Sequence, residues 1–288
     1  MPEGQSGPAR ARQDVSVTEY FKDKAVLITG ASSGIGEELA RQLGRYGSKL
    51  TLAARRRALL DGLADGIATA GASRPLVVDA DVTRDGDMER AVLESVRHWG
   101  TLDVVIANAG FGVVGAFREL SLADYRRQFE TNVFGVLRTI YAALPEIERA
   151  HGNVVIIGSV AGWTATPGTS AYAMSKFALR ALADSITPEF RRTGVTVTLI
   201  SPGFVMSSIR QVDNQGRFHP AAKDSVPAWL AVSTTRAVRQ ILKAVARGKR
   251  EAIVTGHGKI LVALQRFTPW VVRAAFGKTT PKPPSANG

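Results

Sequence analysis

The stretch AVLITGASSGIGEELARQL, residues 25–43, decides how the rest of the chain is interpreted. Its first four residues form an uninterrupted apolar run, which predicts a buried strand. The glycine turn from Thr29 to Gly36 comes next, and a helical pattern follows it. Glycine lets the backbone approach an anion closely, and a helix start directs unpaired N–H groups toward it. We therefore predict a dinucleotide site here, although a tight turn in an ordinary strand–turn–helix unit has a similar pattern.

Length and composition limit the class of protein. A chain of 288 residues with 45% hydrophobic content suits one large α/β domain better than two small ones. The absence of cysteine excludes disulfides, zinc–thiolate sites and thiol nucleophiles. We expect no metal site, because the four histidines are too far apart in sequence for a metal motif: His98, His151, His219 and His257. We find neither a signal-peptide pattern nor an apolar run of the roughly 18 residues that a membrane span needs, and we expect a cytoplasmic, reducing location.

The net charge of +12 is concentrated near one end of the chain. Between Arg236 and Lys282, eleven Lys and Arg residues stand against a single acid, Glu251. Such a region suits anionic lipid, an acidic protein or nucleic acid, or is a solvated helix face with a tail. Because the rest of the chain is nearly neutral, we expect no nucleic-acid partner.

The hydrophobic pattern predicts a doubly wound α/β fold. Apolar runs typical of parallel strands covered on both faces occur near 25–29, 49–54, 75–79, 102–107, 153–158, 195–200 and 251–255. Helical patterns lie near 35–46, 58–70, 84–98, 121–149, 171–192 and 234–247. Helical crossovers between strands give a parallel sheet of about seven strands. Residues 1–22 are predicted to be a flexible lead-in, and 203–233 a long loop of the kind that often forms a lid.

Three arginines, Arg55, Arg56 and Arg57, follow the second predicted strand. In a dinucleotide-binding fold this place usually holds an acid that accepts hydrogen bonds from the adenosine ribose. An arginine there binds a ribose 2′-phosphate, which a carboxylate would repel. The alternative is a solvated helix start, which three cations suit poorly because of the helix dipole. We predict that Arg55 selects NADP(H).

The segment from Tyr172 to Lys176 puts a phenol and an ammonium group four residues apart, on one face of a helix. The pattern alone is weak, but Ser159 ends the fifth apolar run shortly before it. Catalytic groups in parallel sheets lie at the carboxyl edge, so we expect the hydroxyls of Ser159 and Tyr172 to converge.

Together these motifs resemble those of the short-chain dehydrogenase/reductase family, over residues 23–255. Asn132, Ser159, Tyr172 and Lys176 match the catalytic set. The resemblance implies a single Rossmann-type domain, homodimers or homotetramers, and cofactor contacts from Gly30, Ser32, Ser33, Gly34, Ile35, Gly36, Arg55, Asp81, Val82, Asn108, Ala109, Gly110, Tyr172, Lys176, Pro202, Gly203, Val205 and Ser207. Two positions depart from the common pattern: Ala107 replaces an Asn, and Ser207 replaces a Thr but keeps its hydroxyl.

The resemblance also implies hydride transfer between NADP(H) and a carbonyl or alcohol substrate. Tyr172 would exchange a proton with the substrate oxygen, and Lys176 would lower the pKa of the phenol. Moving that pKa from about 10 toward about 7 needs roughly 4 kcal/mol, which one cation at about 4 Å supplies at an effective dielectric of about 20. Ser159 would hold the substrate oxygen, and Asn132 would fix a water that relays protons to Lys176. Without the resemblance, Asn132 would be interpreted as a polar residue that kinks a helix.

Three hypotheses about the function stay open. A lipid- or steroid-like substrate suits the apolar loop residues Phe204, Val205, Met206, Val226, Trp229 and Leu230, which are otherwise lid packing. The second is a reductase of carrier-bound 3-oxoacyl groups, docked through the basic region. The third is a catalytically silent NADP-binding scaffold, which has no need for a filled catalytic set.

The C-terminal segment, 256–288, is apolar and basic. Lys259, Arg266 and Arg273 recur every seven residues among apolar ones, which on a helix forms one narrow charged stripe. Pro269 is predicted to break the segment into two short helices that cannot span a bilayer. We expect the segment to border the active-site mouth, packed on the substrate loop or a partner subunit, or lying at a membrane surface.

Overall fold

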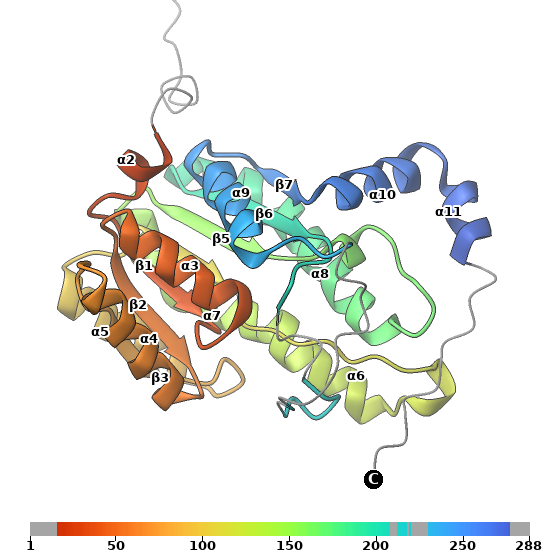
Figure 1. The fold of residues 1–288 in the computed structure, drawn as a ribbon, viewed down its shortest axis with the longest axis horizontal. Helices are drawn as coiled ribbons and strands as arrows, with labels where there is room; N and C mark the ends of the chain where they lie inside the picture. Colours follow the sequence, from red (N-terminus) through yellow and green to blue (C-terminus); the bar gives the residue numbers. More distant parts are fainter. Residues whose placement is uncertain (1–15, 208–211, 218, 220–229, 277–288) are drawn as a thin grey trace, which may run out of the picture.

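The computed structural model describes residues 16–207, 212–217, 219 and 230–276. Seven strands in this part of the chain form one parallel sheet in the order β3-β2-β1-β4-β5-β6-β7 (Figure 1). Their bounds are Ala25–Thr29 (β1), Lys49–Ala54 (β2), Leu76–Asp79 (β3), Val104–Ala107 (β4), Asn153–Ile157 (β5), Thr196–Pro202 (β6) and Glu251–Val254 (β7). Each lies where the apolar runs predicted it, so the doubly wound α/β fold is confirmed.

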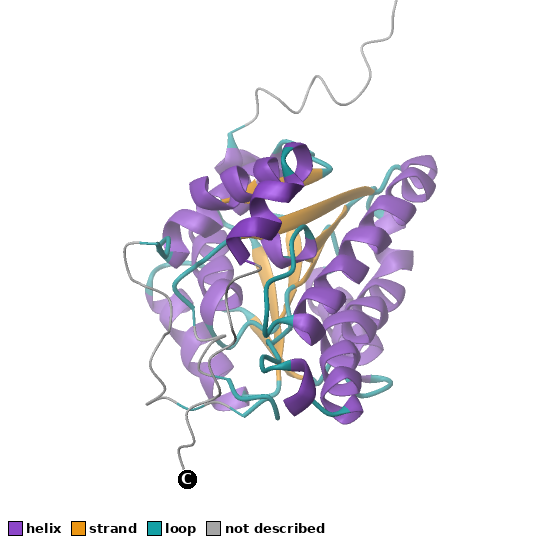
Figure 2. Cartoon of the chain, turned by 90° about the vertical axis from the view of Figure 1, so that its right-hand side faces the viewer, coloured by secondary structure: helices purple, strands orange, loops and turns teal. Residues whose placement is uncertain are grey.

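Helices cover both faces of the sheet, as Figure 2 shows with the strands between two helical layers. One layer buries apolar residues of α3 (Gly34–Arg45), α4 (Arg57–Thr69) and α9 (Thr234–Ala246) against the sheet. The other layer does the same with α5 (Asp87–Trp99), α7 (Gly135–Arg149) and α8 (Ser170–Phe190). Because both faces are buried, the strands are apolar along their whole length rather than alternating.

A short helix, α2 (Val17–Phe21), corrects the predicted flexible lead-in. The Ser16 hydroxyl caps it by accepting a hydrogen bond from the Glu19 amide at 3.1 Å. The Phe21 side chain is fully buried in the core beside the first layer of helices. Five residues are too few to show a helical period, which is why the sequence pattern missed this element. Residues 1–15 of the lead-in lie outside the described residues.

The helical pattern over 121–149 is three segments rather than one helix. Helix α6 (Leu122–Phe129) runs into a π-helical turn, η2 (Glu130–Phe134), and α7 follows directly. Single π-helical turns are rare and frequently mark functional sites. This one holds Asn132, one of the predicted catalytic residues.

The chain between β6 and α9 is described in part, at residues 203–207, 212–217, 219 and 230–233. Val205 and Val232 form an isolated parallel bridge, and the Met206 amide donates to the Val232 carbonyl at 2.9 Å. Residues 208–211, 218 and 220–229 of the predicted substrate loop at 203–233, which include Val226 and Trp229, lie outside the described residues.

Beyond β7 the chain forms α10 (Gly256–Phe267) and α11 (Pro269–Phe276), which we call the C-terminal arm. The break at Thr268 and Pro269 is the one predicted from the sequence. No helix in the described ranges is long and apolar enough to cross a membrane.

Candidate active site

The glycine turn lies at the carboxyl end of β1 and leads into α3. Gly30 and Gly34 have φ angles of 65° and 59°, a left-handed conformation that glycine adopts without strain. A Cβ on Gly36 would lie 2.4 Å from the Gly30 carbonyl oxygen, so the turn closes only without a side chain there. The predicted cofactor turn therefore has its glycines where the backbone requires them.

Asn108 ties this turn to the end of β4. Its side-chain nitrogen donates to the carbonyl oxygens of Thr29 and Gly30 at 2.9 and 3.2 Å. In return, the Thr29 hydroxyl accepts from the amides of Asn108 and Ala109, each at 3.1 Å. These bonds cross the point where the strand order reverses, between β1 and β4, which is where open α/β sheets bind their ligands.

Arg55 and Arg56, at the end of β2, have different surroundings. The Arg55 side chain is 64% exposed, and its guanidinium lies 4.0 Å from the Asp81 carboxylate. Arg56 is more buried and donates to the hydroxyls of Ser32 and Ser33 at 2.9 and 2.7 Å. Burial, followed by the neighbouring charge of Arg55, lowers the pKa of Arg56. Two guanidinium groups thus lie beside the glycine turn. Only that of Arg55 was predicted from the sequence to have a role.

Asp81 and Val82 shape the next side of the site. One Asp81 carboxylate oxygen accepts from the amide and hydroxyl of Thr83, and the Asp81 amide donates to Asp87 at 2.8 Å. That amide bond is the main reason why the pKa of Asp87 is lowered. Val82 is buried against Gly135, where a Cβ would approach its side chain to 2.6 Å. Hydrogen bonds therefore hold Asp81 in place, and packing against Gly135 holds Val82.

Lys176 is buried and lies on α8 one turn after Tyr172. Its Nζ donates to the Ile157 carbonyl at the end of β5 at 2.9 Å, and lies 5.8 Å from the centroid of the Tyr172 ring. Burial lowers the pKa of Lys176 to about 8. The ammonium therefore stays mostly protonated at neutral pH, close to the phenol.

Asn132 is fully buried in the π-helical turn. Its side-chain oxygen accepts from the Phe111 amide at 3.1 Å, and its nitrogen donates to the Phe111 carbonyl and the Ser175 hydroxyl at 3.0 and 3.1 Å. A Cβ on Gly110 would lie 3.0 Å from the Asn132 oxygen and 3.8 Å from Lys176 Nζ. The structure thus brings Asn132, Gly110 and Lys176 together beside the irregular helix turn. The role of Asn132 in fixing a water stays a prediction.

Ser159 follows β5 and caps a short 3-10 turn, η3 (Val160–Gly162), by accepting from the Ala161 amide at 3.1 Å. The Tyr172 ring lies against Gly112, where a Cβ would be 3.6 Å from the ring. Both residues are at the carboxyl end of the sheet, as predicted. The convergence of their hydroxyls stays a prediction.

The segment leaving β6 carries the last group of predicted cofactor contacts. The Gly203 amide donates to the Val254 carbonyl at 3.2 Å, and Val205 is buried at its bridge to Val232. Ser207 is the last described residue before 208–211, which lie outside the described part of the chain. Predicted contacts from separate motifs therefore lie along the ends of β1, β4, β5 and β6.

His257, in the first turn of α10, was not predicted from the sequence as a site residue. Its Nε2 lies 2.9 Å from the Phe204 amide, and the two rings are stacked with centroids 5.6 Å apart. Burial lowers the pKa of His257. A Cβ on Gly203 would lie 2.5 Å from this Nε2. No local motif marks this histidine, because its partner is 53 residues earlier in the chain.

Comparisons with known proteins identify a family for this chain. A model of the short chain dehydrogenase family matches residues 24–217. The protein named 11-beta-hydroxysteroid dehydrogenase A of Sesamum indicum is 31% identical over 269 residues, which cover 90% of this chain and 76% of that protein.

Solved structures are similar over most of the chain. A short chain dehydrogenase/reductase from Burkholderia phymatum in complex with NAD has a TM-score of 0.77 at 22% identity, covering 92% of this chain and 99% of that one. An alcohol dehydrogenase from Thermococcus sibiricus complexed with 5-hydroxy-NADP has a TM-score of 0.71 at 26% identity, covering 81% and 96%. With a family match over more than half of its length and these similarities, the chain belongs to the short-chain dehydrogenase family.

Proposed function

We propose that this protein is an NADP(H)-dependent oxidoreductase that interconverts an apolar ketone or aldehyde and the corresponding alcohol, with Tyr172 as the acid and base. The observation that carries the proposal is the buried ammonium of Lys176, 5.8 Å from the Tyr172 ring at the carboxyl edge of the sheet. Burying an ammonium group costs free energy of folding, and buried ionisable groups of this kind are often found where they have a functional role.

The chemistry follows from these two side chains. A unit charge at 5.8 Å from the Tyr172 ring contributes about 3 kcal/mol at an effective dielectric of about 20, in the direction that favours the phenolate. Tyr172 can then give a proton to a carbonyl oxygen, or take it from an alcohol, near neutral pH. A bound nicotinamide supplies or accepts the hydride. We expect Ser159 to hold the substrate oxygen, and Asn132 to fix a water that relays protons to Lys176.

The preference for NADP(H) is supported by the charges at the glycine turn. Arg55 and Arg56 both lie at the end of β2, and Arg56 is already oriented by Ser32 and Ser33. Two guanidinium groups suit a ribose 2′-phosphate, which adds negative charge at this place. Gly30 and Gly36, where a Cβ would collide with backbone atoms, let the turn close tightly, which suits backbone amides that approach a pyrophosphate.

The substrate class is supported by the apolar side chains next to the site. Phe204 and Met206 are exposed on the segment that leaves β6, where a bound substrate can cover them. The similarity to a protein named for a hydroxysteroid agrees with a large apolar substrate.

A panel of carbonyl compounds tests the proposal. NADPH oxidation is measured with ketones and aldehydes of graded size and polarity, and with a 3-oxoacyl thioester attached to an acidic carrier. We expect the largest kcat/KM for a bulky, apolar ketone. Faster turnover of the carrier-bound substrate would favour the 3-oxoacyl reductase instead, and no turnover of any compound would favour the scaffold.

We also infer that two or more copies associate through α7 and α8. Large apolar side chains on these helices are exposed in the single chain: Phe134 beside them, Tyr141, Met174 and Phe177. Large apolar side chains that stay exposed on neighbouring parts of a surface commonly mark an interface, and Phe134 and Met174 line one shallow pocket. Sedimentation velocity of the wild-type protein and a Tyr141→Glu variant tests this, because a charge in the interface should shift the oligomer toward monomer.

A further inference from the structure

The C-terminal arm joins the body of the protein at one end. The first turn of α10 is tight against the body, since a Cβ on Gly258 would lie 3.0 Å from the Val160 side chain. Val262 and Val272 are buried along the arm, and α11 packs on α10. In Figure 1 the two helices lead away from β7, with α11 at the far end. The arm therefore has an outer side that the rest of the described chain leaves uncovered.

That outer side is apolar. Ile260, Leu264 and Phe267 are spaced four and three residues apart, so they share one face of α10. Phe267 is 76% exposed and Ile260 is 63% exposed, and Trp270, at the start of α11, is 70% exposed. Large apolar side chains gathered in this way indicate a partner that covers them.

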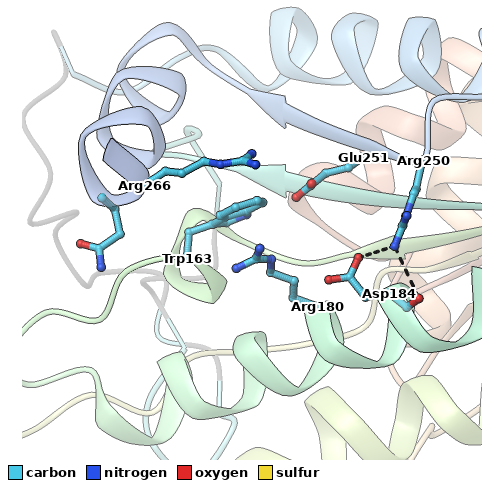
Figure 3. A pocket seen from close by; sticks show the side chains of 7 residues that line it. Trp163, Arg180, Asp184, Arg250, Glu251 and Arg266 are labelled. Carbon is cyan, nitrogen blue, oxygen red and sulfur yellow. Dashed lines mark hydrogen bonds and ion pairs between the residues drawn. The ribbon is translucent and has the colours of Figure 1, made fainter. Parts of the chain in front are cut away.

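The inner side of α10 is partly polar, which is the reverse of what is typical of a surface helix. Gln265 and Arg266 line a cavity of about 520 Å³ that also borders Trp163, Arg180 and Glu251 (Figure 3). In this cavity the Arg180 guanidinium stacks on the Trp163 ring at 3.5 Å from its centroid. The outer apolar residues Ile260, Leu264 and Phe267 do not line this cavity, so they belong to a different side of α10.

The charge of the arm selects between possible partners. Lys259 and Arg273 are exposed, Arg266 lies between them in sequence, and no acid occurs from residue 252 to 276. A second copy of the chain would bring the same cations to the contact, where like charges repel. The arm combines exposed apolar side chains with positive charge. An anionic lipid bilayer suits both, because it offers an apolar interior below a negatively charged surface.

We propose that the C-terminal arm docks on the surface of an anionic lipid bilayer, with Ile260, Leu264 and Phe267 in the interface. Trp270 lies at the depth of the headgroups, where its amphipathic ring is favoured, and Lys259 and Arg273 contact lipid phosphates. The arm lies in the interface and does not cross it, because each of its helices is far shorter than a bilayer. This proposal goes beyond the oxidoreductase activity and does not depend on it.

Vesicle flotation with the full-length protein tests the proposal. We expect it to float with vesicles containing phosphatidylglycerol and to stay unbound with pure phosphatidylcholine. Each exposed cation contributes about fivefold to partitioning onto anionic lipid, so Lys259→Gln with Arg273→Gln should lower binding by roughly twentyfold or more. Phe267→Ser with Trp270→Ser should lower it by at least tenfold.

Matched variants elsewhere on the surface serve as controls. Lys243→Gln with Lys249→Gln removes two exposed cations outside the arm, and Phe117→Ser with Leu122→Ser removes two exposed apolar side chains. Both pairs should keep wild-type vesicle binding. If the wild-type protein floats with neither vesicle, or if the control pairs reduce binding as much as the arm variants, the proposal is wrong. A change of oligomeric state in the Phe267→Ser, Trp270→Ser variant without any vesicle binding would assign the face to a second copy instead.

Discussion

The imidazole Nε2 of His257 accepts a hydrogen bond from the backbone amide of Phe204 at 2.9 Å. A backbone amide only donates, so this nitrogen is unprotonated and the neutral ring carries its proton on Nδ1. Phe204 belongs to the segment leaving β6, next to the predicted nicotinamide contacts, and His257 belongs to the C-terminal arm. One hydrogen bond therefore links the arm to the segment that is predicted to contact the cofactor.

Replacing His257 tests how much its hydrogen bond to Phe204 contributes to stability and to NADPH binding. His257→Phe keeps a ring but leaves the Phe204 amide without its acceptor, which we expect to cost about 1–3 kcal/mol of unfolding free energy and to weaken NADPH binding. His257→Gln supplies another acceptor and should be milder. Urea unfolding and NADPH fluorescence titration measure both effects. Equal losses in the two variants would show that the hydrogen bond is unimportant.

The same histidine predicts an acid-dependent loss of stability. Burial lowers its pKa in the folded protein below the ordinary value of 6.5, so the unfolded chain takes up the proton first. Stability from this group is complete above about pH 6.5 and is lost as pH falls toward the folded-state pKa. The difference in unfolding free energy between wild type and His257→Gln should shrink over this range.

Arg55→Asp should weaken NADPH binding far more than NADH binding. It removes a cation from the predicted 2′-phosphate site and adds a charge that repels phosphate, with an expected loss of about 1.5–3 kcal/mol, or roughly ten- to a hundredfold in Kd. Fluorescence titration with both cofactors measures the change. Arg57→Asp, on a neighbouring exposed arginine that pairs with Asp61, is the matched control. If both cofactors weaken equally, Arg55 does not select between them.

Tyr172→Phe should preserve the fold and NADPH binding but lower kcat by at least a hundredfold, since only the proton donor is removed. Circular dichroism and cofactor titration verify that the variant is intact, and NADPH oxidation measures the loss. Wild-type turnover in this variant would contradict the assigned mechanism and favour the scaffold.

Lys176→Met should abolish turnover and yet raise the stability of the cofactor-free protein. The pKa of Lys176 is about 8 when folded, against 10.5 in the unfolded chain, so burial of its charge opposes folding below pH 8 by about 3 kcal/mol. Between pH 8 and 10.5 the unfolded chain binds the extra proton, and wild-type stability rises relative to the variant. Urea unfolding at pH 7 and pH 10 should therefore show an advantage of the variant that shrinks at the higher pH. A variant less stable at both values would mean that the bond to Ile157 outweighs the charge.

The fold was predictable because its signals are local. Each apolar run is a complete strand, and the glycines of the turn are needed by the backbone of that same turn. The Tyr172 and Lys176 pair also lies within one helix, so spacing alone put both side chains on one face.

The missed features depend on contacts distant in sequence. Arg56 acquires its role from serines 23 and 24 residues away, and His257 from an amide 53 residues away. Helix α2 has too few residues for a period, and it is held by the burial of Phe21 in the assembled core. The π-helical turn at Asn132 likewise follows from bonds to Phe111 and Ser175, which only the folded chain brings near.

Thr255 connects β7 to the arm with a φ angle of 140°, which a β-branched residue adopts only at a cost in energy of about 1–3 kcal/mol. Its hydroxyl caps α10 by accepting from the Gly258 amide at 3.2 Å, and it lies where a Cβ on Gly203 would collide with it. A glycine would relieve the strain but would also free the joint to swivel. The strained threonine therefore restricts the direction in which the arm leaves the sheet, and it couples the orientation of the arm to the position of Gly203.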